Sequence, residues 1–170
     1  MKQGIRMALV ISLAPTALAA QAPGPSVQQR LWHNVTTNIT RAAEEMPEAN
    51  YAFRPTPEVR TFGQLVGHIA GAQYMMCAAS LSDSARAEDD IEKSRKTKAA
   101  LVEALKASTA YCERAYTQTD SALAGSTQLF GENVSRMYAL SLNTVHNGEH
   151  YGNIVTYLRI KGMVPPSSRR

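Results

Sequence analysis

Hydrophobic residues recur every three or four positions along much of this chain, which is the spacing of an amphipathic helix. The first pattern covers residues 27–46 and follows Ser26, a residue type that caps helix N-termini. Three prolines in residues 47–60 exclude a long helix there. A second pattern begins near Thr61 and continues to about residue 81. We therefore expect two helices in this half, separated by an irregular connection.

Two longer patterns occupy the second half of the chain. A third helix is predicted over residues 90–119, and a fourth from about Asn133 to Lys161, where Gly162 and two prolines follow. The connection over residues 121–133 contains two glycines and is interpreted as a loop, because no strand or hairpin pattern is convincing. Four helices of about 20–30 residues joined by loops of about 10–15 residues are typical of a bundle. The pattern therefore predicts an all-α, four-helix-bundle fold.

The first twenty residues differ in character from the rest. Lys2 and Arg6 precede an apolar run that ends in small residues, the order of a cleavable secretory signal peptide. Cleavage after Ala19 or Ala20 leaves residues 21–170 as one bundle domain, with its core over about residues 27–163. A short N-terminal membrane anchor is the alternative interpretation. We predict an exported protein, periplasmic or secreted, without a stable membrane span after cleavage.

The charge balance argues against nucleic acid as a partner. The chain has 18 basic and 14 acidic residues, a net charge of +4, and removal of Lys2 and Arg6 lowers the excess to +2. Nucleic-acid-binding surfaces need clustered Lys and Arg on one element. The nearest run, Lys93 to Lys98, directly follows acidic residues and is interpreted as the solvated start of a helix.

The two cysteines, Cys77 and Cys112, invite a disulfide in an oxidising compartment. If the second and third predicted helices are antiparallel neighbours, however, the residue opposite Cys77 falls near position 95. The offset is roughly 17 residues, or about 25 Å at the helical rise, far beyond disulfide reach. The sequence therefore favours two buried free thiols, and a bridge would require these helices to run parallel.

Three histidines are the candidate chemistry of the chain. His146 and His150 are one helical turn apart in the fourth helix, so their imidazoles project from the same face. His68 lies in the apolar pattern of the second helix, near Gly67 and Gly71, which would let another segment or a ligand come close. Bundle cores are where helical proteins build metal sites, so we expect these three residues to bind one metal ion. The alternative is that each histidine forms a local hydrogen bond.

The stretches FGQLVGHIAG and HNGEHYGNIVTYLRIKGMVPP carry a family resemblance. Over about residues 27–166 the chain resembles the DinB-like (DinB/YfiT) superfamily of metalloenzymes. The resemblance implies a four-helix bundle that holds one divalent metal, zinc or nickel being favoured, through His68, His146 and His150. It also implies that the chain can form a homodimer.

That resemblance implies a metal-dependent hydrolase or a thiol S-transferase acting on an unknown small-molecule substrate. A non-catalytic metal- or ligand-binding bundle is the alternative. Export favours hydrolysis, because the low-molecular-weight thiols used by some relatives are scarce outside the cytoplasm.

Glu149 is the candidate catalytic residue, because a carboxylate beside the metal can accept a proton from bound water. The alternative is that it faces solvent or a neighbouring helix. The spelling His146-x-x-Glu149-His150 also fits the inverted zinc-protease motif. Those proteases take an acidic third ligand downstream, and residues 151–170 contain no Asp or Glu, so that class is excluded. His33, the fourth histidine, is expected to have a surface or hydrogen-bonded role.

Overall fold

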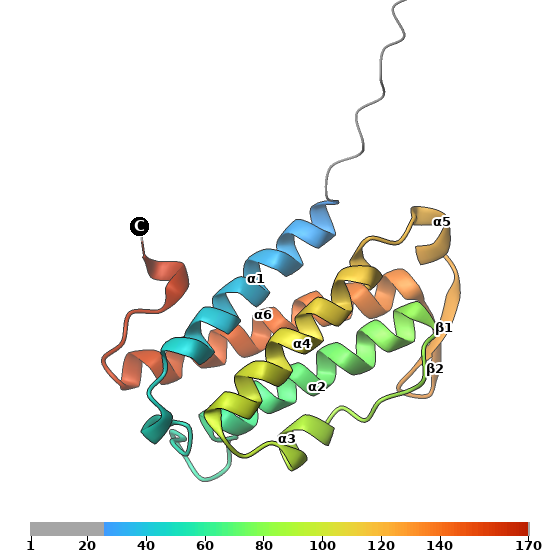
Figure 1. The fold of residues 1–170 in the computed structure, drawn as a ribbon. Coiled ribbons are helices and arrows are strands. Elements are labelled where there is room, and N and C mark those ends of the chain that lie inside the picture. Colours follow the sequence, from blue (N-terminus) through green and yellow to red (C-terminus); the bar gives the residue numbers. More distant parts are fainter. Residues whose placement is uncertain (1–25, 170) are drawn as a thin grey trace, which may run out of the picture.

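The computed structural model describes residues 26–169, and the predicted signal peptide lies outside this range (Figure 1). Four long helices dominate it: α1 (Val27–Glu45), α2 (Phe62–Leu81), α4 (Lys98–Tyr116) and α6 (Arg136–Ile160). Short helices are α3 (Asp90–Ser94), α5 (Asp120–Leu123), η1 (Glu48–Asn50) and η2 (Pro166–Ser168), and a hairpin is formed by β1 (Ser126–Leu129) and β2 (Glu132–Ser135). None of the helices in the described range is long and apolar enough to cross a membrane. The predicted all-α, four-helix bundle is confirmed.

Local chemistry explains where the long helices begin. Each follows a Ser or Thr whose hydroxyl accepts a hydrogen bond from the backbone N–H three residues later, which satisfies one of the unpaired donors of the first turn. These capping residues are Ser26, Thr61, Thr97 and Ser135. At α2 the cap is reciprocal, because the Gln64 side chain also accepts from the backbone N–H of Thr61.

Helix α2 is the centre of the bundle. It packs against both α4 and α6, and α1 covers these two helices from the other side (Figure 1). The largest fully buried side chains come from all four long helices and include Trp32, Phe62, Ile69, Met76, Leu105 and Ile154. Burying such side chains is worth about 1.5–3 kcal/mol each, so the core holds the site-bearing helices α2 and α6 together.

The predicted third helix over residues 90–119 is wrong in one respect that matters for the topology. It is interrupted after α3, and the segment over residues 82–97 runs back along α2 before α4 begins. Helix α4 therefore runs parallel to α2. The Gln73 amide donates to the Ser108 hydroxyl, and further along both segments, seven residues after Gln73 and ten after Ser108, the Gln118 amide donates to the Ser80 hydroxyl.

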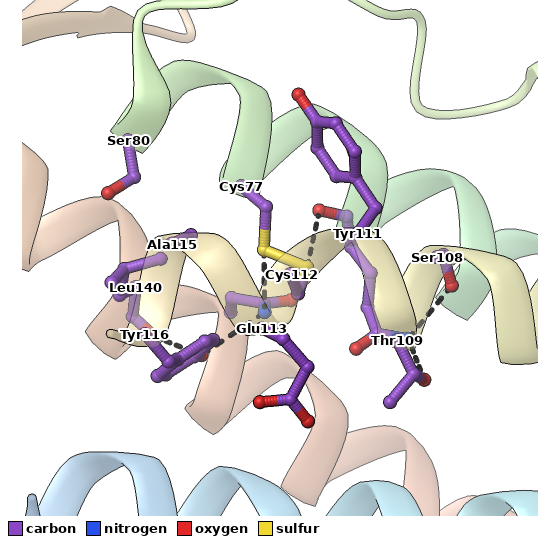
Figure 2. Close-up of a disulfide and its surroundings, with 12 residues drawn as sticks. Cys77, Ser80, Ser108, Thr109, Tyr111, Cys112, Glu113, Ala115, Tyr116 and Leu140 are labelled. Atoms are coloured by element: carbon purple, nitrogen blue, oxygen red, sulfur yellow. Dashed lines mark hydrogen bonds between the residues drawn. A yellow bond between two sulfur atoms is a disulfide. The ribbon is translucent and has the colours of Figure 1, made fainter. Parts of the chain in front are cut away.

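The parallel arrangement overturns the expectation of free thiols. Cys77 and Cys112 form a disulfide with their Cα atoms 5.4 Å apart, buried between α2 and α4 (Figure 2). The prediction was wrong because it assumed antiparallel neighbours. Both cysteines lie near the C-terminal ends of their helices, so an antiparallel pairing would place them at opposite ends of the helix pair. The return segment of residues 82–97 supplies the extra crossing that a parallel pair needs.

A short β-hairpin joins α5 to α6, where the sequence pattern indicated only a loop. Ser126 pairs with Ser135 and Leu129 with Glu132. The two turn residues, Phe130 and Gly131, both have positive φ angles, of 52° and 81°, as two-residue hairpin turns with the favoured twist require. Phe is an unusual residue for that conformation, so the turn carries no familiar sequence signal.

Candidate metal centre

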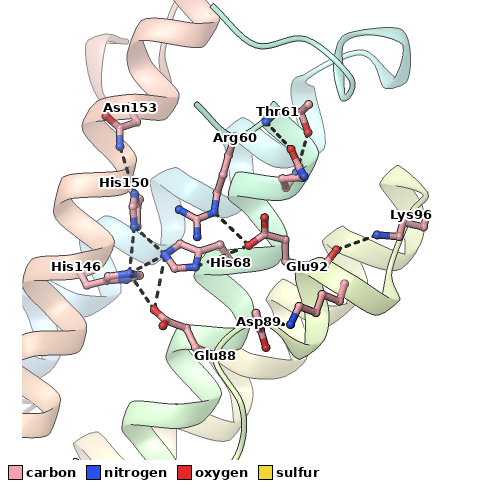
Figure 3. Close-up of polar contacts among 12 residues, drawn as sticks. Arg60, Thr61, His68, Glu88, Asp89, Glu92, Lys96, His146, His150 and Asn153 are labelled. Carbon is pink, nitrogen blue, oxygen red and sulfur yellow. Dashed lines mark hydrogen bonds and ion pairs between the residues drawn. The ribbon is translucent and has the colours of Figure 1, made fainter. Parts of the chain in front are cut away.

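Three histidines converge between α2 and α6 (Figure 3). His68 projects from α2, and His146 and His150 project from successive turns of α6 (Figure 3). Their Nε2 atoms form a nearly equilateral triangle: 3.1 Å for His68–His150, 3.1 Å for His68–His146 and 3.0 Å for His146–His150. The structure thus brings together all three residues that the sequence analysis selected as ligands.

The triangle fits a metal ion better than a hydrogen-bonded cluster. The Nε2 atom of a neutral imidazole is either a donor or an acceptor, so no choice of tautomers makes all three contacts hydrogen bonds. A single cation at the face of the triangle would accept all three lone pairs together. Two nitrogen ligands of a tetrahedral zinc ion, each at about 2.0–2.1 Å, lie roughly 3.3 Å apart, close to the spacing seen.

Electrostatics keep these imidazoles in the form that binds metals. Burial, followed by the charge of Arg60, lowers the pKa of His68 to about 4. Burial, the two other histidines and Arg60 lower the pKa of His146 to about 3. Burial also lowers the pKa of His150, although Glu149 opposes this shift. At neutral pH all three rings are therefore neutral and offer lone pairs.

The second nitrogen of each ring has a different environment. The Nδ1 atom of His150 is 3.2 Å from the Asn153 side-chain amide, and that of His68 is 4.0 Å from Glu92 Oε2. The Nδ1 atoms of His68 and His146 are both buried and have no hydrogen-bond partner within residues 26–169. When Nε2 is a ligand, Nδ1 carries the proton, so Asn153 must then present its oxygen and Glu92 is the acceptor nearest to His68.

A carboxylate also faces the triangle itself. Glu88 Oε1 lies 3.7 Å from His68 Nε2 and 3.9 Å from His146 Nε2 (Figure 3). These separations are too long for direct hydrogen bonds. They place an oxygen acceptor beside the point at which the three lone pairs meet, on one edge of the site.

Two glycines explain how that carboxylate reaches the site. A Cβ atom on Gly71 would lie 1.9 Å from the backbone oxygen of Glu88, and one on Gly67 would lie 2.8 Å from Glu92 Cα. The close approach predicted at these glycines is therefore real, and the segment that uses it is the return segment of residues 82–97. Side chains larger than hydrogen would push Glu88 and Glu92 away from the histidines.

Glu149 lies on the exposed side of α6. No contact found among residues 26–169 joins its carboxylate to a ring nitrogen, so the geometry gives its predicted catalytic role no support. His33 pairs at the surface with Glu113 at 3.1 Å, as expected for a histidine outside the site.

Glu88 and Glu92 were not predicted as site residues. Both lie among the acidic residues that directly precede the basic run Lys93 to Lys98, and no role was predicted for them. The available signal was the pair Gly67 and Gly71 around His68, which indicated a close neighbour without identifying it.

A cavity of about 620 Å³ adjoins the histidine cluster. His150 forms part of its wall, together with residues from the α1–α2 connection, α2, α3 and the second half of α6. Polar and charged lining residues include Arg60, Glu92, Asn153 and Thr156, and apolar ones include Val59, Leu65 and Tyr157. This volume lies within the range of small-molecule sites.

Comparison with known proteins identifies the fold. A sequence model of the DinB superfamily matches residues 31–154. No curated protein matches the chain.

Several solved structures share the architecture. A DinB-like protein from Bacillus cereus ATCC 10987 superposes with a TM-score of 0.69 at 15% identity, over 82% of this chain and 93% of its own. YfiT from Bacillus subtilis, a probable metal-dependent hydrolase with an unusual four-helix bundle topology, has a TM-score of 0.61 at 18% identity, over 85% of this chain and 94% of its own. The mycothiol-dependent maleylpyruvate isomerase has a TM-score of 0.60 at 16% identity, over 77% of this chain and 64% of its own. At these identities the likeness is one of fold.

Proposed function

The chain belongs to the DinB superfamily, and on this premise we propose that it is an exported, metal-dependent hydrolase of a small molecule. His68, His146 and His150 would hold one divalent ion. The observation that carries the proposal is the convergence of three neutral Nε2 atoms within 3.0–3.1 Å of one another. The description of YfiT as a probable metal-dependent hydrolase adds support.

When bound by three neutral imidazoles, such an ion supplies Lewis acidity and lowers the pKa of a water or thiol ligand. The residues around it supply the rest of the chemistry. Glu88 Oε1, 3.7 and 3.9 Å from two of the ligand nitrogens, is suited to accept a proton from an attacking water and return it to the leaving group. We assign this role to Glu88 in place of Glu149. Asn153 would orient His150 through Nδ1, and Glu92 is the carboxylate that lies on the Nδ1 side of His68.

Turnover is favoured over passive metal storage by two features. A proton acceptor stands at the edge of the site, and a cavity large enough for a small substrate reaches His150. A storage site needs neither of these. Zinc and nickel both suit this ligand set.

Export is supported by the disulfide as well as by the N-terminal pattern. Disulfides persist in oxidising compartments and are rare in the cytosol, and Cys77–Cys112 is buried in the core rather than at an exposed redox site. Outside the cytoplasm, low-molecular-weight thiols are scarce, so hydrolysis is preferred to thiol transfer.

The role of Glu88 is tested with a matched pair of variants, Glu88→Gln and Glu149→Gln, in the mature, zinc- or nickel-loaded protein. We expect Glu88→Gln to lower the rate of ester or amide hydrolysis by about 10²–10⁴-fold, as loss of a general base does, without lowering metal content. Glu149→Gln should retain the parent rate. Equal rates for the parent and Glu88→Gln, or loss only in Glu149→Gln, would contradict the assignment.

A further inference from the structure

We infer that the cavity beside the histidines selects substrates that carry an anionic group, a carboxylate or a phosphate-type oxyanion, and that Arg60 binds this group. The inference rests on the proposed function in taking the cavity as the substrate site. The binding step itself needs only Arg60 and the cavity.

Arg60 is held at the cavity wall, and the N–H groups of its terminal nitrogens remain available to a ligand. Its Nε donates to Glu92 Oε2 at 3.1 Å, and its backbone oxygen accepts a hydrogen bond of 2.5 Å from the Tyr157 hydroxyl. The guanidinium has five N–H donors, and no protein contact to its two terminal nitrogens is found among residues 26–169. Figure 3 shows the guanidinium pointing from the start of α2 toward the histidine cluster. Its side chain is 43% exposed, so a ligand can reach it.

Among the described residues that line the cavity, Arg60 is the one arginine or lysine. Glu58 also lines the cavity, but it is exposed and its carboxylate is already engaged by its own backbone N–H and by Thr56.

The remaining cavity residues indicate the size and character of the substrate. Val59, Leu65 and Tyr157 offer apolar surface, and Thr56, Asn153 and Thr156 offer polar groups. A small organic acid derivative fits this mixture, with its anionic end on Arg60 and its scissile bond toward His150. Arginine suits the task because its planar fork binds carboxylate and phosphate groups through two parallel hydrogen bonds.

The test is calorimetric binding at pH 8 to both the metal-free and the zinc-loaded mature protein. The probes are phenylacetate, phenylphosphonate and the neutral isostere phenylacetamide. The proteins are the parent, Arg60→Gln, Arg60→Lys and the control Arg114→Gln, which removes another exposed arginine that is paired with an acid, Asp83. Thermal melting verifies that each variant folds.

We expect the metal-free parent to bind at least one anion and to bind the amide at least about tenfold more weakly, the scale of a lost charged hydrogen bond. Arg60→Gln should weaken anion binding by a similar factor, Arg60→Lys by less, and Arg114→Gln not at all. The stronger of the two anions identifies a carboxylate or a phosphate-type group.

Three results would overturn the inference: equal binding of acid and amide, anion binding that Arg60→Gln leaves unchanged, or anion binding only in the zinc-loaded form and independent of Arg60. The acid–amide comparison needs no variant, so misfolding of Arg60→Gln would not leave the inference untested. Arg60-dependent binding to a protein that takes up no metal would uphold the anion site and refute the proposed function.

Discussion

At the scale of single residues, the site consists of three neutral rings, two buried and one partly buried, and the carboxylates that face them. The sequence was sufficient to select the rings, because a one-turn spacing places His146 and His150 on one face and an apolar helix must bury His68. It was insufficient for Glu88 and Glu92. Their contact with the rings depends on a return segment whose path leaves no periodic pattern in the sequence.

The depressed pKa values of the histidines predict how the metal-free protein responds to acid. In the unfolded chain these rings take up protons near pH 6.5, whereas folded His68 does so only near pH 4 and His146 only near pH 3. The unfolded state therefore binds more protons as the pH falls below 6.5, and the free energy of unfolding decreases until the folded pKa is reached. For His68 alone the loss is about 3 kcal/mol at most.

Chemical denaturation of the metal-free parent and of His146→Asn at several pH values measures this effect. The parent should lose stability relative to the variant as the pH is lowered from 6.5 to 4. A difference between the two proteins that stays constant over that range would refute the prediction.

At the scale of elements, periodicity located the long helices but not the direction in which they pack. The α1, α2 and α6 patterns were correctly assigned, because each has an apolar stripe and a capping residue. The parallel α2–α4 pair could not be deduced, since both directions bury the same stripe. The hairpin was missed because its turn is Phe-Gly instead of a common turn dipeptide.

Two helical glycines provide a matched test of the return segment. Gly71→Ala places a Cβ atom 1.9 Å from the Glu88 backbone oxygen, so we expect a loss of about 1–3 kcal/mol in unfolding free energy from overpacking. Gly148→Ala meets nothing within 4 Å and should be neutral or stabilising by up to about 1 kcal/mol, because alanine is the better helix former. Urea denaturation of both variants measures the difference. Equal stabilities would show that Glu88 does not rest against Gly71.

At the scale of the whole molecule, the disulfide joins α2 to α4 across 35 residues of sequence. Closing a loop of that length stabilises a fold by about 2–4 kcal/mol, mainly by restricting the unfolded chain. The Cys77→Ala/Cys112→Ala double variant should therefore lose stability of this size. Thermal melting under non-reducing conditions is the measurement, and a variant as stable as the parent would indicate that the bridge contributes nothing.

The central claim is that three histidines from α2 and α6 hold one metal ion, and metal analysis of the untagged mature protein tests it most directly. The parent is compared with His146→Ala/His150→Ala and with His33→Ala, which removes a histidine that pairs with Glu113 outside the site. We expect close to one equivalent of zinc or nickel in the parent and in His33→Ala, and almost none in the double variant. No metal in the parent after reconstitution with either ion, or equal metal in all three proteins, would contradict the account.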